Sequence, residues 1–163
     1  IETLYPPLCL QYEVAQQLLM MNDTINDAGH RLVVTSGFRD PWIQDILHAK
    51  SQKNSPTQSH ASVAPPQHSE HQLGTTIDVT SFEKGGYVRR IDFENSTMYA
   101  WLSRHAHEYG FIQSYMQGQE SVTGYIAEPW HFRYVGVSIA TDVKKSELSL
   151  NEYLANDLFL ENI

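Results

Sequence analysis

The sequence predicts a single α+β domain over residues 1–163, for three reasons. A chain of 163 residues has about the length of one domain. Segments with apolar residues at helical spacing alternate with short β-branched runs, which favour strands. Neither an internal repeat nor a break in composition divides the chain. With 41% hydrophobic residues, we expect these helices and strands to share one core.

The first half of the chain is expected to form a helix, a strand, a second helix and a long loop. Apolar residues recur at helical spacing over 11–28, and a β-branched strand follows at 32–34. Asp40 can cap a helix over 41–50 that starts with proline. Residues 51–68 contain Ser, Gln, Asn, Pro and His with little to bury, so we expect a surface loop. Such a loop either feeds a functional site or is merely mobile.

The second half is expected to contain three strands and two helices. β-branched and aromatic runs predict strands at 75–80, 111–112 and 130–135. A helix is expected over 97–108, where a serine precedes it and a glycine follows it. The segment 149–152 has the Ser-x-x-Glu spacing of a capping box, so we expect a last helix there.

Composition and charge exclude several classes of function. Nineteen acidic and eleven basic residues give a net charge of −8, so we expect no nucleic-acid partner and no polybasic lipid contact. No apolar run approaches the roughly 20 residues of a transmembrane helix, so none is expected in this chain. A single cysteine, Cys9, excludes an intramolecular disulfide. The chain begins at Ile1, and we expect any export signal or anchor to lie outside it.

Two segments, 69–78 and 128–134, contain most of the residues that indicate chemistry. A catalytic zinc takes three ligands from His, Asp or Glu, and His71, Asp78 and His131 would meet that number. Asp78 is the strongest of these, because an acid within a β-branched run is costly to bury unless it is paired or binds a cation. Surface positions for both histidines remain open from spacing alone.

Two further residues fit a metal site. Gly74 would let the chain turn so that His71 and Asp78 face one ion. Glu128 would remain free to act as a base, since zinc lowers the pKa of water to about 7 and a nearby carboxylate can accept its proton. The alternative is that Glu128, before a proline, is a solvated turn residue.

The segment 69–78 has the pattern Ser-x-His-x-x-Gly-x-x-x-Asp, and the segment 128–134 reads Glu-Pro-Trp-His-Phe-Arg-Tyr. These segments resemble the first and the second metal motif of the VanY-type zinc D-alanyl-D-alanine carboxypeptidases. That family is related to VanX-like dipeptidases, phage cell-wall peptidases and the hedgehog signalling domain. Ser-Gly-Phe-Arg at 36–39, followed by Gln44, resembles the substrate-binding segment. The resemblance covers about residues 10–155.

The resemblance implies a fold and a set of metal ligands. The expected fold is a small, mainly antiparallel sheet flanked by helices, with one Zn²⁺ per chain bound on the sheet. The implied ligands are His71, Asp78 and His131, and the implied general base is Glu128. Arg39 is implied as the anion contact, either for the developing oxyanion or for the terminal carboxylate of the substrate, since a guanidinium suits both.

The resemblance also implies the substrate contacts. Ser69 and Gln44 would hold the terminal carboxylate, Tyr125 and Trp130 would form walls of the pocket, and Ser36 belongs to the substrate-binding segment. One departure is Ser-Tyr-Met at 114–116, where relatives often have Arg-Tyr-Pro.

The implied function is removal of C-terminal D-alanine from peptidoglycan stem peptides or their precursors. Three alternatives remain open: an L,D-carboxypeptidase acting on tetrapeptide stems, a peptidoglycan endopeptidase, and a zinc-containing binding module without turnover. We expect the protein in the cell envelope, where stem peptides are exposed, with a cytoplasmic enzyme acting on precursors as the alternative.

Overall fold

The computed structural model describes residues 1–5, 7–54 and 62–160. The strands are β1 (Glu2–Thr3), β2 (Leu32–Ser36), β3 (Thr76–Glu83), β4 (Gly86–Tyr87), β5 (Phe111–Gln113) and β6 (His131–Tyr134). The α-helices are α1 (Tyr12–Asp27), α2 (Pro41–Asn54), α4 (Thr97–His105), α5 (Glu120–Thr123), α6 (Val137–Ser146) and α7 (Leu150–Leu160). The 3₁₀ helices are η1 (Glu70–Leu73), η2 (Arg90–Asn95) and η3 (Ala106–Tyr109). Among these helices, none has the length and hydropathy needed to cross a membrane.

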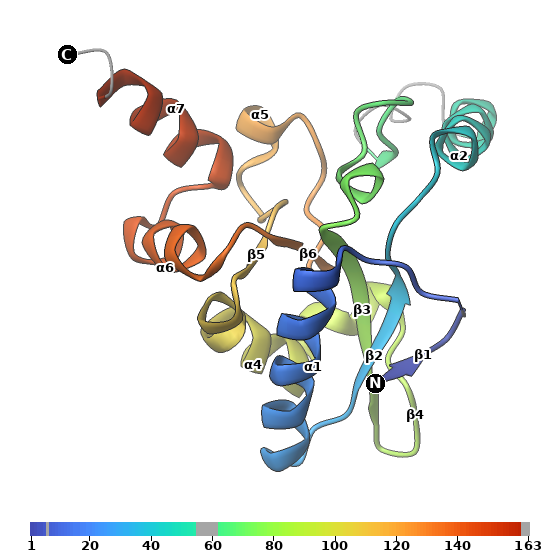
Figure 1. Ribbon diagram of the computed structural model, residues 1–163. Helices are drawn as coiled ribbons and strands as arrows, with labels where there is room; N and C mark the ends of the chain where they lie inside the picture. Colours follow the sequence, from blue (N-terminus) through green and yellow to red (C-terminus); the bar gives the residue numbers. More distant parts are fainter. Residues whose placement is uncertain (6, 55–61, 161–163) are drawn as a thin grey trace.

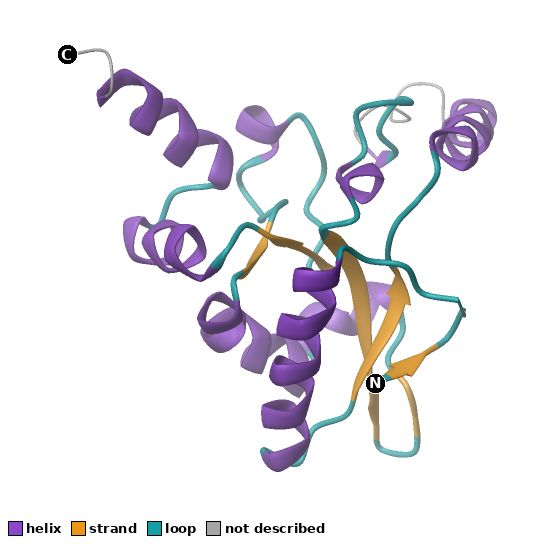
Figure 2. Cartoon of the chain, viewed as in Figure 1, coloured by secondary structure: helices purple, strands orange, loops and turns teal. Residues whose placement is uncertain are grey.

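The strands form one sheet in the order β1-β2-β3-β6-β5, with β4 paired to β3. Only the β1–β2 pairing is parallel, so the described sheet is mainly antiparallel, as predicted. Figure 2 shows the strands grouped in the middle with helices around them. The pairing of β3 with β6 sets Asp78 opposite His131, and the pairing of β2 with β3 sets Ser36 opposite Asp78. The register of the sheet therefore brings three distant segments to one place.

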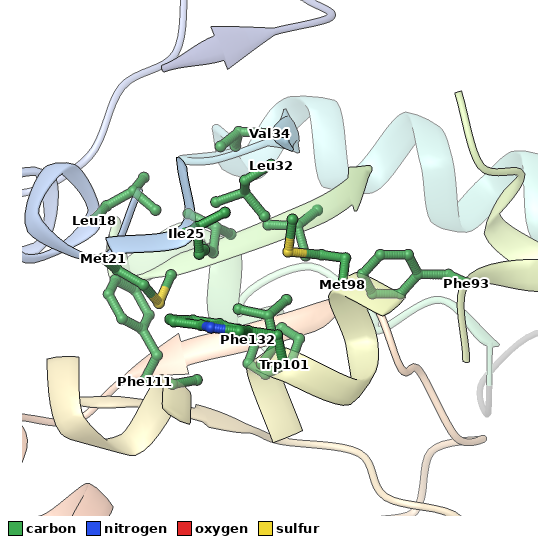
Figure 3. Close-up of a cluster of buried hydrophobic side chains, with 14 of the residues drawn as sticks. Leu18, Met21, Ile25, Leu32, Val34, Phe93, Met98, Trp101, Phe111 and Phe132 are labelled. Carbon is green, nitrogen blue, oxygen red and sulfur yellow. The ribbon is translucent and has the colours of Figure 1, made fainter. Parts of the chain in front are cut away.

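The main core lies between the sheet and the helices α1 and α4. The predicted apolar stripe of α1 is confirmed, because its four residues are at most 2% exposed: Val14, Leu18, Met21 and Ile25. Figure 3 shows Leu18, Met21 and Ile25 facing side chains of the sheet and of α4, including Phe132 and Trp101. A smaller cluster joins Ile112 to residues of α6 and α7. Ile77 and Val79 of β3 face this core, so a slip of one residue would place Asp78 in it, and burial therefore fixes the register of β3.

Replacing Leu102 by alanine should lower the free energy of unfolding by about 2–5 kcal/mol. Leu102 lies on α4 and is 2% exposed, so its removal leaves a cavity in the core. Urea denaturation measures the change. The matched control is Leu19→Ala on α1, which is 45% exposed and should change stability by no more than about 0.5 kcal/mol. Equal losses in the two variants would contradict this core.

The elements differ from the sequence prediction in several places, and the helices show the largest differences. The helix expected over 41–50 continues as α2 to Asn54, inside the expected loop 51–68, because no proline interrupts the chain before position 56. Residues 55–61 of that loop lie outside the described residues. The helix expected over 97–108 changes to 3₁₀ geometry after His105. The helix α6 was not predicted, because its β-branched residues favour strands.

Candidate metal centre

Three segments position His71, Asp78 and His131. His71 lies on η1, Asp78 on β3 and His131 directly opposite Asp78 on β6. Gly74 ends η1 with φ 69° and ψ 15°, a left-handed conformation that glycine adopts without steric cost. The predicted turn between His71 and Asp78 is therefore confirmed. The 36–39 segment also packs here, since the backbone N–H of Arg39 donates to the carbonyl of His71.

The three side chains are arranged as a ligand group. One ligand atom from each lies within 4.8 Å of the other two, and the residues are 3%, 4% and 4% exposed. Nε2 of His71 lies 3.3 Å from Oδ1 of Asp78, and Nδ1 of His131 lies 3.1 Å from the same oxygen. Two imidazoles and one carboxylate are donors that a catalytic zinc accepts, with a fourth position left for water or substrate. The residues present therefore fit zinc.

The charges around the group also favour a cation. Burial alone would raise the pKa of Asp78, but hydrogen bonds from His131 and His71 hold it well below its ordinary value. Burial lowers the pKa of His71, which favours the neutral imidazole that a metal requires. Burial would also lower the pKa of His131, but hydrogen bonds to Asp78 and Glu70 raise it to about 9. A bound metal ion would replace the proton on His131 as the charge that balances these buried carboxylates.

Glu128 lies beside the ligand group without belonging to it. Its Oε2 is 3.4 Å from Nδ1 of His131, and its side chain is 18% exposed. Burial raises the pKa of Glu128 above its ordinary value. A raised carboxyl pKa suits a group that accepts a proton and later returns it. The position of Glu128 is therefore compatible with the predicted role of a base.

A pocket of about 330 Å³ opens over this group and contains most of the predicted substrate contacts. Arg39, Gln44, Ser69 and Tyr125 all line it. Arg39 donates to Oε1 of Gln44 at 2.9 Å, and buried Gln44 donates to the carbonyl of Ala64 at 2.6 Å. The guanidinium of Arg39 is thus held in a fixed orientation beside the ligand group.

Two predicted substrate contacts do not line the pocket. Ser36 contacts Arg39 instead, with its Oγ 3.4 Å from Nη2. We expected Trp130 as a wall, but its ring lies beneath the guanidinium of Arg90, 4.4 Å from ring centroid to Cζ, and packs against the core. Arg90 therefore faces the pocket in its place and donates to Oδ2 of Asp78 at 2.8 Å. Sequence reasoning missed Arg90, which lies in no motif that we identified.

Sequence reasoning also missed Glu70 and its partners. Oε2 of Glu70 lies 2.9 Å from Nε2 of His131 and accepts from Ser114 at 2.6 Å. Oε1 accepts from Nη1 of Arg133 at 2.9 Å. Glu70 and Arg133 both lie inside the two motifs, beside the residues that we selected. Their opposite charges were a signal, but only the packing of η1 against β6 shows that they meet. Tyr115 also lines the pocket, with its ring centroid 4.8 Å from that of His131.

Two imidazoles, one aspartate and a neighbouring free glutamate are the groups that a mononuclear zinc hydrolase uses. A family model described as VanY, D-alanyl-D-alanine carboxypeptidase, matches residues 8–137. The chain belongs to this family, as the motifs predicted.

The chain is also similar to individual carboxypeptidases in sequence and in structure. The chain is 32% identical over 145 residues to the putative carboxypeptidase YodJ of Bacillus subtilis (strain 168), covering 88% of this chain and 53% of YodJ. Its structure is similar to that of the LdcB LD-carboxypeptidase, with a TM-score of 0.86, 29% identity and coverage of 95% of this chain and 74% of the other.

A second similar structure contains zinc. It is a mutant of the vancomycin resistance D,D-pentapeptidase VanY in complex with Zn(II), with a TM-score of 0.79, 28% identity and coverage of 94% of this chain and 88% of the other. The chain spans about half the length of the first curated relatives that it matches, between 43% and 53%.

Proposed function

We propose that the protein is a zinc-dependent carboxypeptidase that removes C-terminal D-alanine from peptidoglycan stem peptides. The observation that carries this proposal is the buried group of His71, Asp78 and His131, with Glu128 beside it and Arg39 in the same pocket. The D-alanyl-D-alanine carboxypeptidase family supplies the substrate class. We further propose that the protein acts in the cell envelope, because stem peptides are exposed there.

The roles of the residues follow from their positions. His71, Asp78 and His131 would hold zinc, which when bound supplies Lewis-acid activation of the scissile carbonyl and of the attacking water. Glu128 accepts the proton of that water at its carboxylate and gives it to the nitrogen of the leaving D-alanine. Arg39 stays charged in its pocket and offsets negative charge, either on the developing oxyanion or on the terminal carboxylate of the substrate.

A second candidate function is L,D-carboxypeptidase activity on tetrapeptide stems. The observation that favours it is the TM-score of 0.86 to the LdcB LD-carboxypeptidase, against 0.79 to the VanY D,D-pentapeptidase. The substrate ends in a carboxylate in either case, so the two candidates differ in the residue before the scissile bond.

Mass spectrometry of a mixture of pentapeptide and tetrapeptide stems tests both candidates. The zinc-loaded protein should release one alanine from the pentapeptide and leave the tetrapeptide intact. Loss of alanine from the tetrapeptide alone would instead establish L,D cleavage. If both peptides survive with zinc bound, the carboxypeptidase proposal fails for these substrates.

Replacing Arg39 by lysine should lower kcat/KM for the pentapeptide about 100-fold, because lysine keeps the charge but loses the planar fork. Arg104→Lys, at an exposed position on α4, makes the same change away from the pocket and should have no effect. A pentapeptide with a C-terminal amide separates the two roles of Arg39. The penalty should disappear on the amide if Arg39 binds the terminal carboxylate, and persist if it stabilises the oxyanion. Unchanged kcat/KM on both substrates would exclude both roles.

A further inference from the structure

The two histidines of the ligand group present different nitrogens to Asp78. His71 has its Nδ1 2.7 Å from the carbonyl oxygen of Gly37, so Nδ1 carries the proton and Nε2 faces Asp78. In His131 the arrangement is reversed, since Nδ1 faces Asp78 and Nε2 faces Glu70 at 2.9 Å. A metal ion at the group therefore requires the proton of His131 on Nε2, away from the ion.

Each group that contacts the Glu70 carboxylate can donate a hydrogen bond to it. Arg133, which can only donate, occupies Oε1 at 2.9 Å. The hydroxyl of Ser114 donates to Oε2 at 2.6 Å, and Nε2 of His131 is the third partner. The side chain of Glu70 is only 14% exposed, so surrounding residues restrict its rotation. An ionised carboxylate satisfies all three partners at once, with the imidazole proton on Nε2.

We propose that Glu70 is a positioning residue that keeps the proton of His131 on Nε2, so that the lone pair of Nδ1 points at the metal, and that Arg133 makes a carboxylate necessary at this position. This inference rests on the proposed zinc site and deepens it. Carboxylates that bond to the second nitrogen of a ligand histidine fix its tautomer and orientation. Here the same carboxylate is itself fixed by the donor Arg133.

The glutamine variant gives this proposal a specific consequence. Glutamine has one acceptor and one donor end, and in Glu70→Gln its amide nitrogen must face either Arg133 or His131. Arg133 cannot accept a hydrogen bond, whereas the imidazole can. The amide nitrogen should therefore turn to Nε2 of His131, which moves the imidazole proton to Nδ1 and blocks the metal position. A second change, Arg133→Gln, supplies an acceptor and should let the glutamine oxygen return to His131.

Competition with a chromogenic chelator measures zinc affinity without any peptide substrate. The four proteins compared are the wild type, Glu70→Gln, Arg133→Gln and the double variant. Glu70→Gln should weaken zinc binding about 10–100-fold, Arg133→Gln should change it little, and the double variant should recover most of the loss. Glu13→Gln, at an exposed position, is the matched control for the charge change. Wild-type affinity in Glu70→Gln, or a double variant as weak as Glu70→Gln, would overturn the proposal.

Nuclear magnetic resonance of the zinc-loaded, ¹⁵N-histidine-labelled wild type gives an independent result. His131 should show a proton on Nε2 and zinc on Nδ1, and the opposite assignment would overturn the proposal. Failure of the proposed function is distinguishable, because it would appear as a wild-type protein that binds no zinc or cleaves no stem peptide. A wild type that binds zinc, with a Glu70→Gln variant that binds it equally well, removes only the positioning role.

Discussion

Replacing Glu128 by glutamine should lower kcat for stem-peptide hydrolysis by about 1,000-fold and leave zinc bound. Glutamine has nearly the same shape but cannot accept the proton of the attacking water. Glu128 lies outside the ligand group, with its Oε2 3.4 Å from Nδ1 of His131, so its loss should not remove the metal. Burial raises the pKa of the Glu128 carboxyl, and glutamine has no carboxyl to take up and return a proton.

Release of D-alanine and the zinc content of the same sample measure the two parts of this prediction. Glu120→Gln is the matched control, since Glu120 is an exposed acid at the start of α5 and the change in charge is the same. It should keep full activity. A Glu128→Gln variant with wild-type kcat would exclude Glu128 as the base, and one without zinc would show that Glu128 supports the metal.

Replacing Asp78 by asparagine should abolish the stabilisation that zinc gives to the fold. A ligand that binds only the folded state at 100 times its Kd adds about 2.7 kcal/mol, which raises Tm by about 5–10 °C for a domain of this size. Asp78 provides the anionic ligand that both histidines face, and asparagine has the same shape without the charge. The variant should therefore show almost no rise in Tm with zinc, and no turnover.

Thermal unfolding with and without zinc measures this effect. Asp92→Asn changes an acid whose side chain is 49% exposed and paired with Arg89 at the surface, and it should keep the full rise in Tm. An equal rise in wild type and Asp78→Asn would mean that zinc binds elsewhere.

Local patterns predicted the helices and strands where packing agrees with them. The stripe of α1 and the β-branched run of β3 both face the core, so periodicity and burial coincide. The helix α2 shows the opposite, because it buries Gln44 and His48 while Trp42 is 61% exposed and Ile46 is 56% exposed. Figure 1 shows α2 set apart from α1 and α4, which cover the core. No periodic pattern in the sequence could reveal that a polar face is the buried one.

The motif residues of the site could be predicted from the sequence, but the hydrogen bonds and ion pairs that connect them could not. The metal ligands and Glu128 were selected because two segments resemble a known family, and the structure brings these residues together. The contacts of Glu70 with Arg133 and of Arg90 with Asp78 join residues 63 and 12 positions apart. These contacts depend on how η1 and η2 pack beside the paired strands, and local patterns in the sequence do not reveal that arrangement. The aromatic Trp130 was misplaced for the same reason.

The zinc site is the central claim, because every role that we assign depends on it. Anomalous X-ray scattering from zinc-loaded crystals, measured on both sides of the zinc absorption edge, tests it most directly. We expect one zinc peak per chain, within coordination distance of Nε2 of His71, Oδ1 of Asp78 and Nδ1 of His131. A peak bounded by other residues, or no peak in crystals that diffract with zinc present, would contradict the claim.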